Sequence, residues 1–232
     1  MSGVGPLQVD PEARAHLRPM MQVDIEAVAA LHAADMGQSL WAELGGGFLR
    51  ALYGLLVDDP GFIGFVTERQ GHIGGFIAGS TDADAMMARV FRRGAPLLGA
   101  RALPALLRRP GLLRRLAETP RYARLSALPG PRVPAESLFC TVEPALRGQR
   151  VAGLLNEALF EELLARGHSF VKITTETSNT AARRQLGSWG FEERGAFAFY
   201  GKDMLICTLS LRDHPRLKPR SRHPMLDRAA PR

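Results

Sequence analysis

The sequence predicts one α/β domain, and three patterns lead to this class. A strand-like segment at residues 16–22 runs directly into an amphipathic helix, two short runs rich in Ile, Phe and Val flank a Gln-Gly pair, and strand and helix patterns alternate from residue 137 onward. The chain has 232 residues and is 46% hydrophobic. A chain of this size can bury about 70% of its unfolded surface, which suffices for one core.

The composition of the chain indicates the cellular compartment in which we expect the protein. The first residues, MSGVGPLQVDPEARAHLRP, carry acids, arginines and a proline where a signal peptide has an apolar core, and no later run approaches ~18 uninterrupted apolar residues. We therefore expect a cytoplasmic protein without a transmembrane segment. Cys140 and Cys207 lie far apart in apolar segments, with no second Cys or His at ligand spacing, so we expect buried thiols and no metal site.

The formal net charge is +7, and nearly all of the positive charge comes from arginine. A positive field favours anionic partners such as nucleotides, phosphorylated cofactors, nucleic acid or acidic lipids, without distinguishing between them. His32, His72 and His168 fall on a predicted helix, beside a turn and in a loop. We expect surface or capping roles for these histidines.

The first third of the chain predicts two helices and a hairpin. Asp24 is a suitable N-cap for the first helix. The second, over residues 39–57, should break at glycines 45–47, because each glycine costs up to ~1 kcal/mol relative to alanine. A ligand beside the break and close packing of a neighbouring element both remain open as its cause. A β-hairpin follows over residues 61–80, with its turn at Gln70-Gly71.

Residues 82–134 have a different character and are interpreted as an insertion. Leu and Arg occur in pairs there, with prolines between them, so we expect two or three short amphipathic helices broken by proline. Its arginines could bind nucleic acid or a membrane surface, or form the solvated face of packed helices; both interpretations remain open. They are Arg92, Arg93, Arg101, Arg108, Arg109, Arg114 and Arg115.

The second half alternates regularly. The expected elements are strands at 137–142 and 170–176, helices at 147–165 and 179–189, and two final strands. The segment after residue 212 is polar, basic and rich in proline, so it has too few apolar residues to pack. The domain is therefore expected over residues 16–212, between an unstructured lead at 1–15 and a disordered basic tail at 213–232.

The junction TVEPALRGQRVAGLL, residues 141–155, joins a strand to a helix almost without a loop. Apolar residues from Val151 onward follow helical spacing, so one face of this helix packs on the sheet and its N-terminus lies at the sheet edge. Amides in the first turn and the helix dipole suit a phosphate or pyrophosphate, and Gly148 allows close backbone approach. Strand, glycine and helix are also what a tight turn alone requires.

The order of motifs adds a resemblance. The segments RGQRVA, AESLFCTVEPALRGQRVAGLL and SNTAARRQLGSWGFEE resemble, respectively, the pyrophosphate loop, the fourth strand with its helix, and a later helical segment of the GCN5-related N-acetyltransferase superfamily. HIGGFIAG stands where that family has its third strand. The resemblance covers roughly residues 16–82 and 135–212. It implies a mixed, mostly antiparallel central sheet with helices on both faces and a helical insertion after the third strand.

The resemblance also implies acetyl-CoA as co-substrate, held in a slot between the fourth and fifth strands. Backbone groups of Cys140, Thr141 and Val142 would pair with the pantetheine arm, and Asn179 would position it from the far side. Amides of the loop and first helical turn would hold the pyrophosphate. These belong to Arg147, Gly148, Gln149, Arg150, Val151, Ala152 and Gly153.

The chain departs from the family pattern at three positions. Arg150 stands at the position where the family's loop usually has its first glycine. Its side chain should therefore face solvent or clamp the phosphate. Leu186 and Thr174 stand where many relatives have a tyrosine acid and some a glutamate base. We name Glu136, then Glu176, as candidate base, and Tyr200 as candidate acid. Ordinary solvated charge for the two glutamates, and packing for the tyrosine, remain open alternatives.

Three functions are compared. The first is acetyl-CoA-dependent transfer of an acyl group to a primary amine in a ternary complex, which positioning and carbonyl polarisation can drive without a covalent enzyme intermediate. The arginines of the insertion favour an anionic acceptor, and a homodimer is compatible with the sequence. The second is a non-catalytic acyl-CoA-binding protein that uses the insertion to engage a partner, which Leu186 and Thr174 favour. The third, nucleic-acid binding, lacks interleaved aromatic residues and is not expected.

Overall fold

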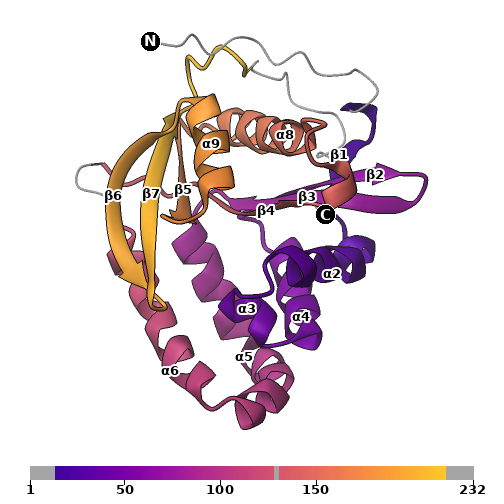
Figure 1. The fold of residues 1–232 in the computed structure, drawn as a ribbon, viewed down its shortest axis with the longest axis vertical. Helices are drawn as coiled ribbons and strands as arrows, with labels where there is room; N and C mark the ends of the chain where they lie inside the picture. The colour runs from indigo at the N-terminus through magenta and orange to yellow at the C-terminus, as the bar shows by residue number, and fades with distance from the viewer. Residues whose placement is uncertain (1–13, 128–130, 218–232) are drawn as a thin grey trace, which may run out of the picture.

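A computed structural model describes residues 14–127 and 131–217 (Figure 1). In this part of the chain a seven-stranded mixed sheet has the order β1-β2-β3-β4-β5-β7-β6. Only β4 and β5 pair in parallel; the remaining neighbours are antiparallel. The strands are β1 (Leu17–Pro19), β2 (Phe62–Arg69), β3 (His72–Ser80), β4 (Glu136–Val142), β5 (Phe170–Glu176), β6 (Glu192–Phe199) and β7 (Lys202–Ser210).

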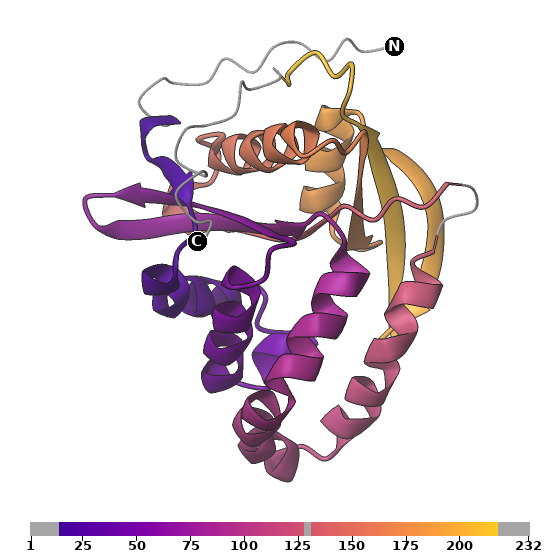
Figure 2. The ribbon, with the colours of Figure 1, turned by 180° about the vertical axis from the view of Figure 1, so that it is seen from behind.

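Helices cover both faces of the sheet. α8 (Val151–Ala165) and α9 (Thr180–Trp189) lie on one face, and the earlier helices lie on the other (Figures 1 and 2). The earlier helices are α2 (Ile25–Asp35), α3 (Leu40–Glu43), α4 (Gly46–Val57), α5 (Ala83–Arg108), α6 (Gly111–Glu118) and α7 (Tyr122–Leu125). The expected α/β architecture, with helices on both faces of a mostly antiparallel sheet, is confirmed.

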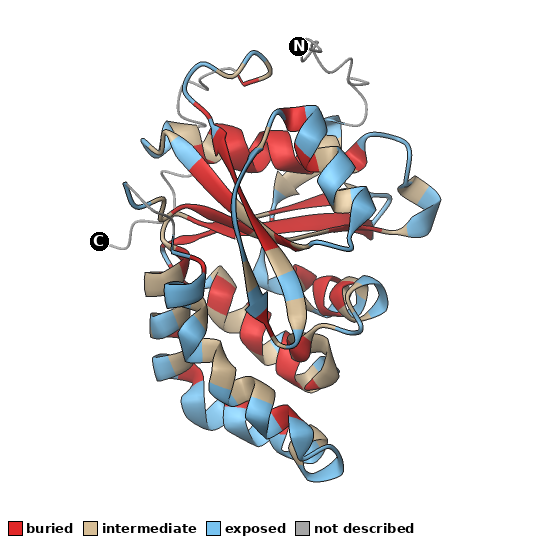
Figure 3. Cartoon of the chain, turned by 60° about the vertical axis from the view of Figure 1, so that its left-hand side comes forward, coloured by how far each residue is buried: buried red, intermediate tan, exposed pale blue. Residues whose placement is uncertain are grey.

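Each face of the sheet has its own core. One cluster packs α2, α4 and α5 under the first strands and includes Leu52, Tyr53 and Phe76. The other packs α8 against the opposite face and includes Leu159 and Phe160. Figure 3 shows this burial concentrated where helices and sheet meet, whereas the outer surfaces of α5 and α6 are exposed. Burial of apolar surface therefore fixes the sheet between two helical layers.

The predicted hairpin is present. β2 and β3 pair over their full length, and the turn residues Gln70 and Gly71 have φ of 53° and 79°. Two successive positive φ values match a type I′ turn, whose twist suits antiparallel strands. The predicted break near residue 45 is also confirmed: Gly45, with φ of 98°, separates α3 from α4.

The insertion differs from its prediction in one respect. α5 is a single helix of 26 residues that contains Pro96 and Pro104, rather than short helices broken at these positions. Its buried residues recur every three or four positions, from Ala83 through Met86, Val90, Gly94 and Leu98 to Ala102. Both prolines lie on the exposed side, where water can satisfy the carbonyls that proline leaves without a donor. Packing of one continuous stripe thus outweighs the local cost of proline.

Both ends of the domain also differ from expectation. The first strand is shorter than residues 16–22, because residues 22–24 form a 3-10 turn. The chain is packed beyond residue 212: the His214 Nε2 bonds the Trp189 carbonyl at 2.8 Å, and Leu217 is buried. His214 and Arg216 also lie against the Trp189 ring, at 5.3 and 5.2 Å. The other residues of the expected lead and tail, 1–13 and 218–232, lie outside the described residues.

Among the described residues, no helix is both long and apolar enough to cross a membrane.

Candidate functional site

The parallel strands β4 and β5 separate soon after they begin. They pair only at Glu136 with Lys172 and at Ser137 with Ile173. The remainder of β4 pairs with β3 on its other edge, through Cys140, Thr141 and Val142 among others. β4 therefore presents one strand edge to a widening gap, and such an edge offers backbone donors and acceptors to an extended ligand.

The junction after β4 is built for close backbone approach. Gly148 has φ of 80° and Arg150 has φ of 62°, so both are left-handed. α8 begins at Val151, four residues later than expected, because a 3-10 turn at residues 144–146 precedes it. The Leu154 amide makes the first bond of this helix, 3.1 Å from the Arg150 carbonyl. The amides of residues 151–153 consequently have no acceptor within the helix.

The left-handed backbone explains why glycine suits position 150. A non-glycine residue in this conformation costs roughly 1–2 kcal/mol. Arg150 nevertheless adopts it, and its side chain is exposed. The backbone of the loop is therefore kept despite the substitution, and the guanidinium adds positive charge beside the first turn of α8.

The neighbouring side chains brace this loop. Asp35, at the end of α2, accepts a bond from Arg147 Nη2 at 2.5 Å and another from the Thr141 hydroxyl. Arg147 Nε also donates to the Val142 carbonyl at 3.1 Å. Gln149 Nε2 bonds the Ala145 carbonyl at 2.9 Å. Arg147 and Gln149 thus hold the loop with their side chains.

A cavity of about 720 Å³ lies on the opposite face from α8. Its walls come from α3, α5, α6, α7, β4, β5 and the β6–β7 hairpin. The lining thus combines residues of the 39–57 segment, the insertion and the sheet. Glu136, Glu176 and Tyr200, the three catalytic candidates, all line the cavity.

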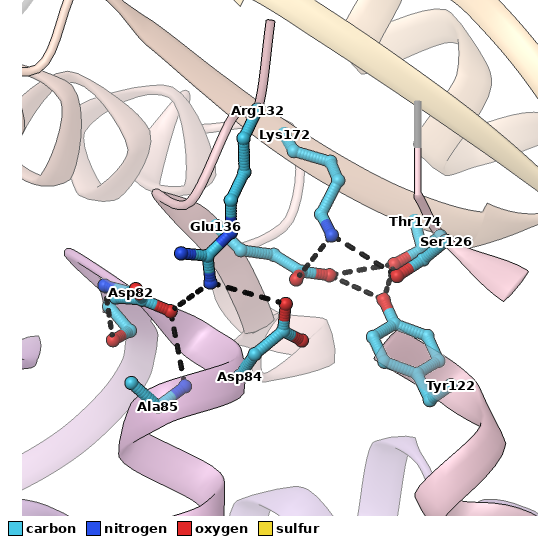
Figure 4. Close-up of polar contacts among 10 residues, drawn as sticks. Asp82, Asp84, Ala85, Tyr122, Ser126, Arg132, Glu136, Lys172 and Thr174 are labelled. Carbon is cyan, nitrogen blue, oxygen red and sulfur yellow. Dashed lines mark hydrogen bonds and ion pairs between the residues drawn. The ribbon is translucent and has the colours of Figure 1, made fainter. Parts of the chain in front are cut away.

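Glu136 is the most constrained of these candidates, at 1% exposed. Its Oε2 lies 3.2 Å from Lys172 Nζ, and its Oε1 accepts bonds from Thr174 Oγ1 at 2.9 Å and from the Tyr122 hydroxyl (Figure 4). Lys172 Nζ also bonds Ser126 Oγ at 3.2 Å. The carboxylate is therefore fixed in orientation where β4 and β5 diverge, with one face toward the cavity.

Tyr122 and Lys172 are two members of this network that sequence analysis did not identify. Burial, together with the charge of Glu136, raises the pKa of Tyr122 well above its ordinary value, so the phenol keeps its proton at neutral pH. Nothing local in the segment PRYARL links it to β4. A lone lysine inside the apolar strand FVKITTE was a usable signal, because a buried ammonium requires a partner.

The other two candidates lie at the rim. Glu176 Oε1 is 2.5 Å from Lys202 Nζ, in a partly exposed pair. The Tyr200 hydroxyl lies 2.7 Å from Thr119 Oγ1, which ties the insertion to the β6–β7 turn. Burial raises the pKa of Tyr200, so this phenol is also protonated at neutral pH.

Three further positions singled out in the sequence have structural partners. Asn179 caps α9, with Oδ1 accepting the Ala182 amide at 3.0 Å. Leu186 is buried against Leu205 and Cys207, so α9 presents apolar surface where many relatives would have a tyrosine. Thr174 uses its hydroxyl within the Glu136 network.

Six of the seven arginines that suggested an anionic acceptor do not line the main cavity. Arg108 and Arg109 line a second hollow together with Arg101, Gly45 and Gly47. Among the described residues that line the main cavity, Arg115 is the only arginine, and it pairs with Glu43 at 2.5 Å. Arg108 and Arg109 therefore lie away from the proposed acceptor site, and the charge of the acceptor stays a prediction.

His32 is buried, which contradicts the surface role expected for it. The side chain is enclosed by Tyr53 and Phe139, with Nδ1 2.8 Å from the Tyr53 hydroxyl and Nε2 3.2 Å from Ser39 Oγ. Burial lowers the pKa of His32 to about 4, although Asp35 acts in the opposite direction. By contrast His72 is exposed, with Nε2 2.8 Å from Glu143.

We predict that acid destabilises the fold through His32. Its pKa is about 6.5 when unfolded and about 4 when folded, so the unfolded state binds the proton first as the pH falls. The contribution is absent above pH 6.5 and reaches a loss of roughly 3 kcal/mol below both pKa values. Urea unfolding at several pH values should show a flatter pH dependence for His32→Asn than for the wild type. A wild-type slope in His32→Asn would exclude this histidine as the cause.

The thiols and metal-binding groups add no further chemistry. Cys207 is buried, and Cys140 is partly buried beside Asn156 Nδ2 at 3.8 Å. Burial raises the pKa of Cys140 to about 12, so its sulfur is a protonated thiol at neutral pH. Within the described part of the chain, no three His, Cys, Asp or Glu residues gather in a way that could hold a metal ion.

Comparison with known proteins identifies the fold. No protein-family model and no curated protein matches the chain. Among solved structures, an N-acetyltransferase from Staphylococcus aureus Mu50 is similar, with TM-score 0.54, 15% identity and coverage of 84% of this chain and 98% of that one. A ribosomal-protein-alanine N-acetyltransferase from Brucella melitensis has TM-score 0.53, 20% identity and coverage of 84% and 98%.

A third similar structure is described as a putative acetyltransferase of the GNAT family from Desulfovibrio desulfuricans. It has TM-score 0.52 and 10% identity, and the match covers 84% of this chain and 98% of that one. At these identities the likeness concerns the fold. The chain therefore has the fold of the GCN5-related N-acetyltransferases, as its motifs indicated.

Proposed function

We propose that this chain, which has the GCN5-related N-acetyltransferase fold, transfers the acetyl group of acetyl-CoA to a primary amine within a ternary complex. One observation carries the proposal. The divergence of β4 from β5 opens a strand edge that runs from a buried carboxylate, Glu136, to the first turn of α8. Donor and acceptor would meet along this edge.

The residues present fit acetyl-CoA at the donor end. The edge of β4 at Cys140, Thr141 and Val142 can hold an extended amide-containing arm, and the amides of residues 151–153 suit a pyrophosphate. Arg150 adds positive charge there. Asn179 remains a proposed contact on the far side of the gap. Acetyl-CoA supplies the activated thioester and a stable thiolate leaving group.

Glu136 is the proposed general base. The acceptor nitrogen forms its bond to the acetyl carbon as the carbon–sulfur bond breaks, and the nitrogen proton passes to Glu136 directly or through water. Thr174 and Tyr122 fix the carboxylate by their bonds to Oε1, and Lys172 balances its charge. Glu176 is the second candidate, because it also lines the cavity but lies at the rim in a partly exposed pair with Lys202.

Tyr200 is the proposed acid for the thiolate, and this can be tested against a neighbour. Tyr200→Phe should lower kcat by about 10²-fold if the phenol donates a proton. Thr119→Val removes the partner of the same hydroxyl. It should leave kcat nearly unchanged. Equal, small losses in the two variants would assign Tyr200 to packing of the insertion instead.

The proposal is tested by thiol release from acetyl-CoA in the presence of a panel of primary amines, with the acetylated amine detected by mass spectrometry. We expect amine-dependent CoA release and stoichiometric N-acetylated product. Hydrolysis of acetyl-CoA at the same rate with and without amine would contradict a transferase.

One observation favours a second candidate function. Leu186 is buried in the core and Thr174 is engaged by Tyr122 and Glu136, so neither position supplies a catalytic group. A non-catalytic acyl-CoA-binding protein would keep the strand edge and the α8 N-terminus. It would bind acetyl-CoA and release no CoA with any amine of the panel.

A further inference from the structure

The main cavity is lined largely by apolar side chains that the protein covers only in part. Seven large ones on its walls are only partly buried, and six of these pack on one side against the first core. Partly exposed apolar surface that is gathered in one concave region is typical of a ligand-binding site. The seven are Trp41, Met87, Phe91, Leu116, Leu138, Phe139 and Met204.

The aromatic wall is organised by ring contacts. The Trp41 ring stacks on Phe48 with centroids 5.8 Å apart, and it meets Phe91 of α5 at 5.5 Å. Trp41 and Phe91 both line the cavity, whereas Phe48 is buried behind them. Phe48 therefore supports the wall from the core side, and Trp41 and Phe91 leave ring surface toward the cavity.

The charged groups of the lining are already balanced within the protein. Arg115 pairs with Glu43 and Lys202 with Glu176, each at 2.5 Å, and Asp84 lies 3.6 Å from Arg132. Each of these groups therefore has an opposite charge beside it, although the buried Arg115 Nε makes no hydrogen bond among the described residues. Glu136, paired with Lys172 where β4 and β5 diverge, is the acid of the lining that is placed to receive an amine.

We infer that the acceptor is a small primary amine carried on an apolar, ring-bearing body. Its amine lies beside Glu136, and its body fills the space between Trp41, Phe91 and Leu116. The inference rests on the proposed function for this site. The cavity volume, about 720 Å³, is in the range of pockets that enclose small organic ligands.

This assignment gives the insertion a role. α5 and α6 contribute Met87, Phe91 and Leu116 to the wall, so the segment between β3 and β4 shapes acceptor specificity. Its outward arginines need no acceptor contact in this account.

The test compares amines of different character with the full chain. Binding of 2-phenylethylamine, octylamine, ethanolamine and spermidine is measured by calorimetry with saturating CoA, and kcat/KM by thiol release from acetyl-CoA. We expect 2-phenylethylamine to bind about 30-fold or more tightly than ethanolamine, because it buries an additional ring. Equal or tighter binding of ethanolamine or spermidine would overturn the apolar acceptor.

Matched variants on one helix locate the site. Phe91→Ser should weaken 2-phenylethylamine binding about tenfold, since it removes part of the ring wall. Leu107→Ser changes an exposed residue of the same helix that does not line the cavity. It should leave binding unchanged. Thermal unfolding of both variants verifies that they are folded, and an unaltered affinity in folded Phe91→Ser would contradict the inference.

The two proposals fail differently. CoA release with polar amines alone would keep the transferase and remove the apolar acceptor. Failure of acetyl-CoA to bind would remove the transferase, while amine binding by calorimetry would still decide what the cavity accepts. No binding of either apolar amine by a folded protein would overturn the inference.

Discussion

Glu136→Gln is expected to lower kcat/KM for amine acetylation by about 10²- to 10⁴-fold, the usual contribution of a positioned general base. Glutamine has the shape of the carboxylate and can still accept from Thr174 and Tyr122, but it cannot take the amine proton. The measurement is thiol release as a function of pH. The limb of the pH profile that belongs to the base should disappear, while the Kd of acetyl-CoA stays unchanged.

Two controls separate chemistry from structure. Glu176→Gln should lose less than about tenfold, because its carboxylate is at the rim and partly exposed. Glu136→Gln combined with Lys172→Met removes both members of the buried pair and should be stable but inactive. If this double variant regained wild-type kcat/KM, Glu136 would have only a structural role.

Lys172→Met is expected to destabilise the fold by about 3–5 kcal/mol, because it leaves the Glu136 carboxylate buried without its counter-ion. Urea unfolding at neutral pH measures this loss. Adding Glu136→Gln should restore most of the stability, since the second substitution removes the stranded charge. A Lys172→Met protein as stable as the wild type would show that the buried Glu136 does not require Lys172 as its counter-ion.

A second lysine provides the matched comparison. Lys202 forms an ion pair with Glu176 at 2.5 Å, but both side chains are about one-third exposed. Lys202→Met should therefore cost no more than about 1 kcal/mol. Similar losses for the two lysine variants would mean that burial does not determine the strength of these pairs.

Much of the fold follows from local sequence signals. The Gln70-Gly71 turn, the cap at Asn179 and the left-handed Gly190 after α9 each depend on residues within a few positions of one another. Such signals fix element type and order. They also placed the helix N-terminus after β4 correctly at the sheet edge, although α8 begins four residues later than expected.

The parts that sequence did not predict depend on contacts between distant segments. α5 passes through Pro96 and Pro104 because packing on α4 maintains one buried stripe, and propensity contains no such information. Tyr122 reaches Glu136 and Thr174, which lie 14 and 52 residues away in sequence. His32 became a core residue for the same reason, since Tyr53 and Phe139 enclose it.

Arg150 shows both a local sequence signal and a departure from it. The family motif usually has a glycine at this position, and the structure has a left-handed arginine there. Arg150→Gly should therefore retain acetyl-CoA binding, because the loop keeps its conformation and loses only one cation. Arg150→Val should weaken binding more strongly, since a β-branched residue disfavours positive φ. Calorimetric Kd values for both variants would test this; equal weakening would assign the effect to charge alone.

The most direct test of the account is a calorimetric titration of the protein with acetyl-CoA, compared with acetyl-pantetheine, which has the thioester arm without the nucleotide and pyrophosphate. We expect micromolar binding of acetyl-CoA and at least about tenfold weaker binding of acetyl-pantetheine, because the first turn of α8 holds the pyrophosphate. No binding of acetyl-CoA, or equal affinity for both compounds, would contradict this account.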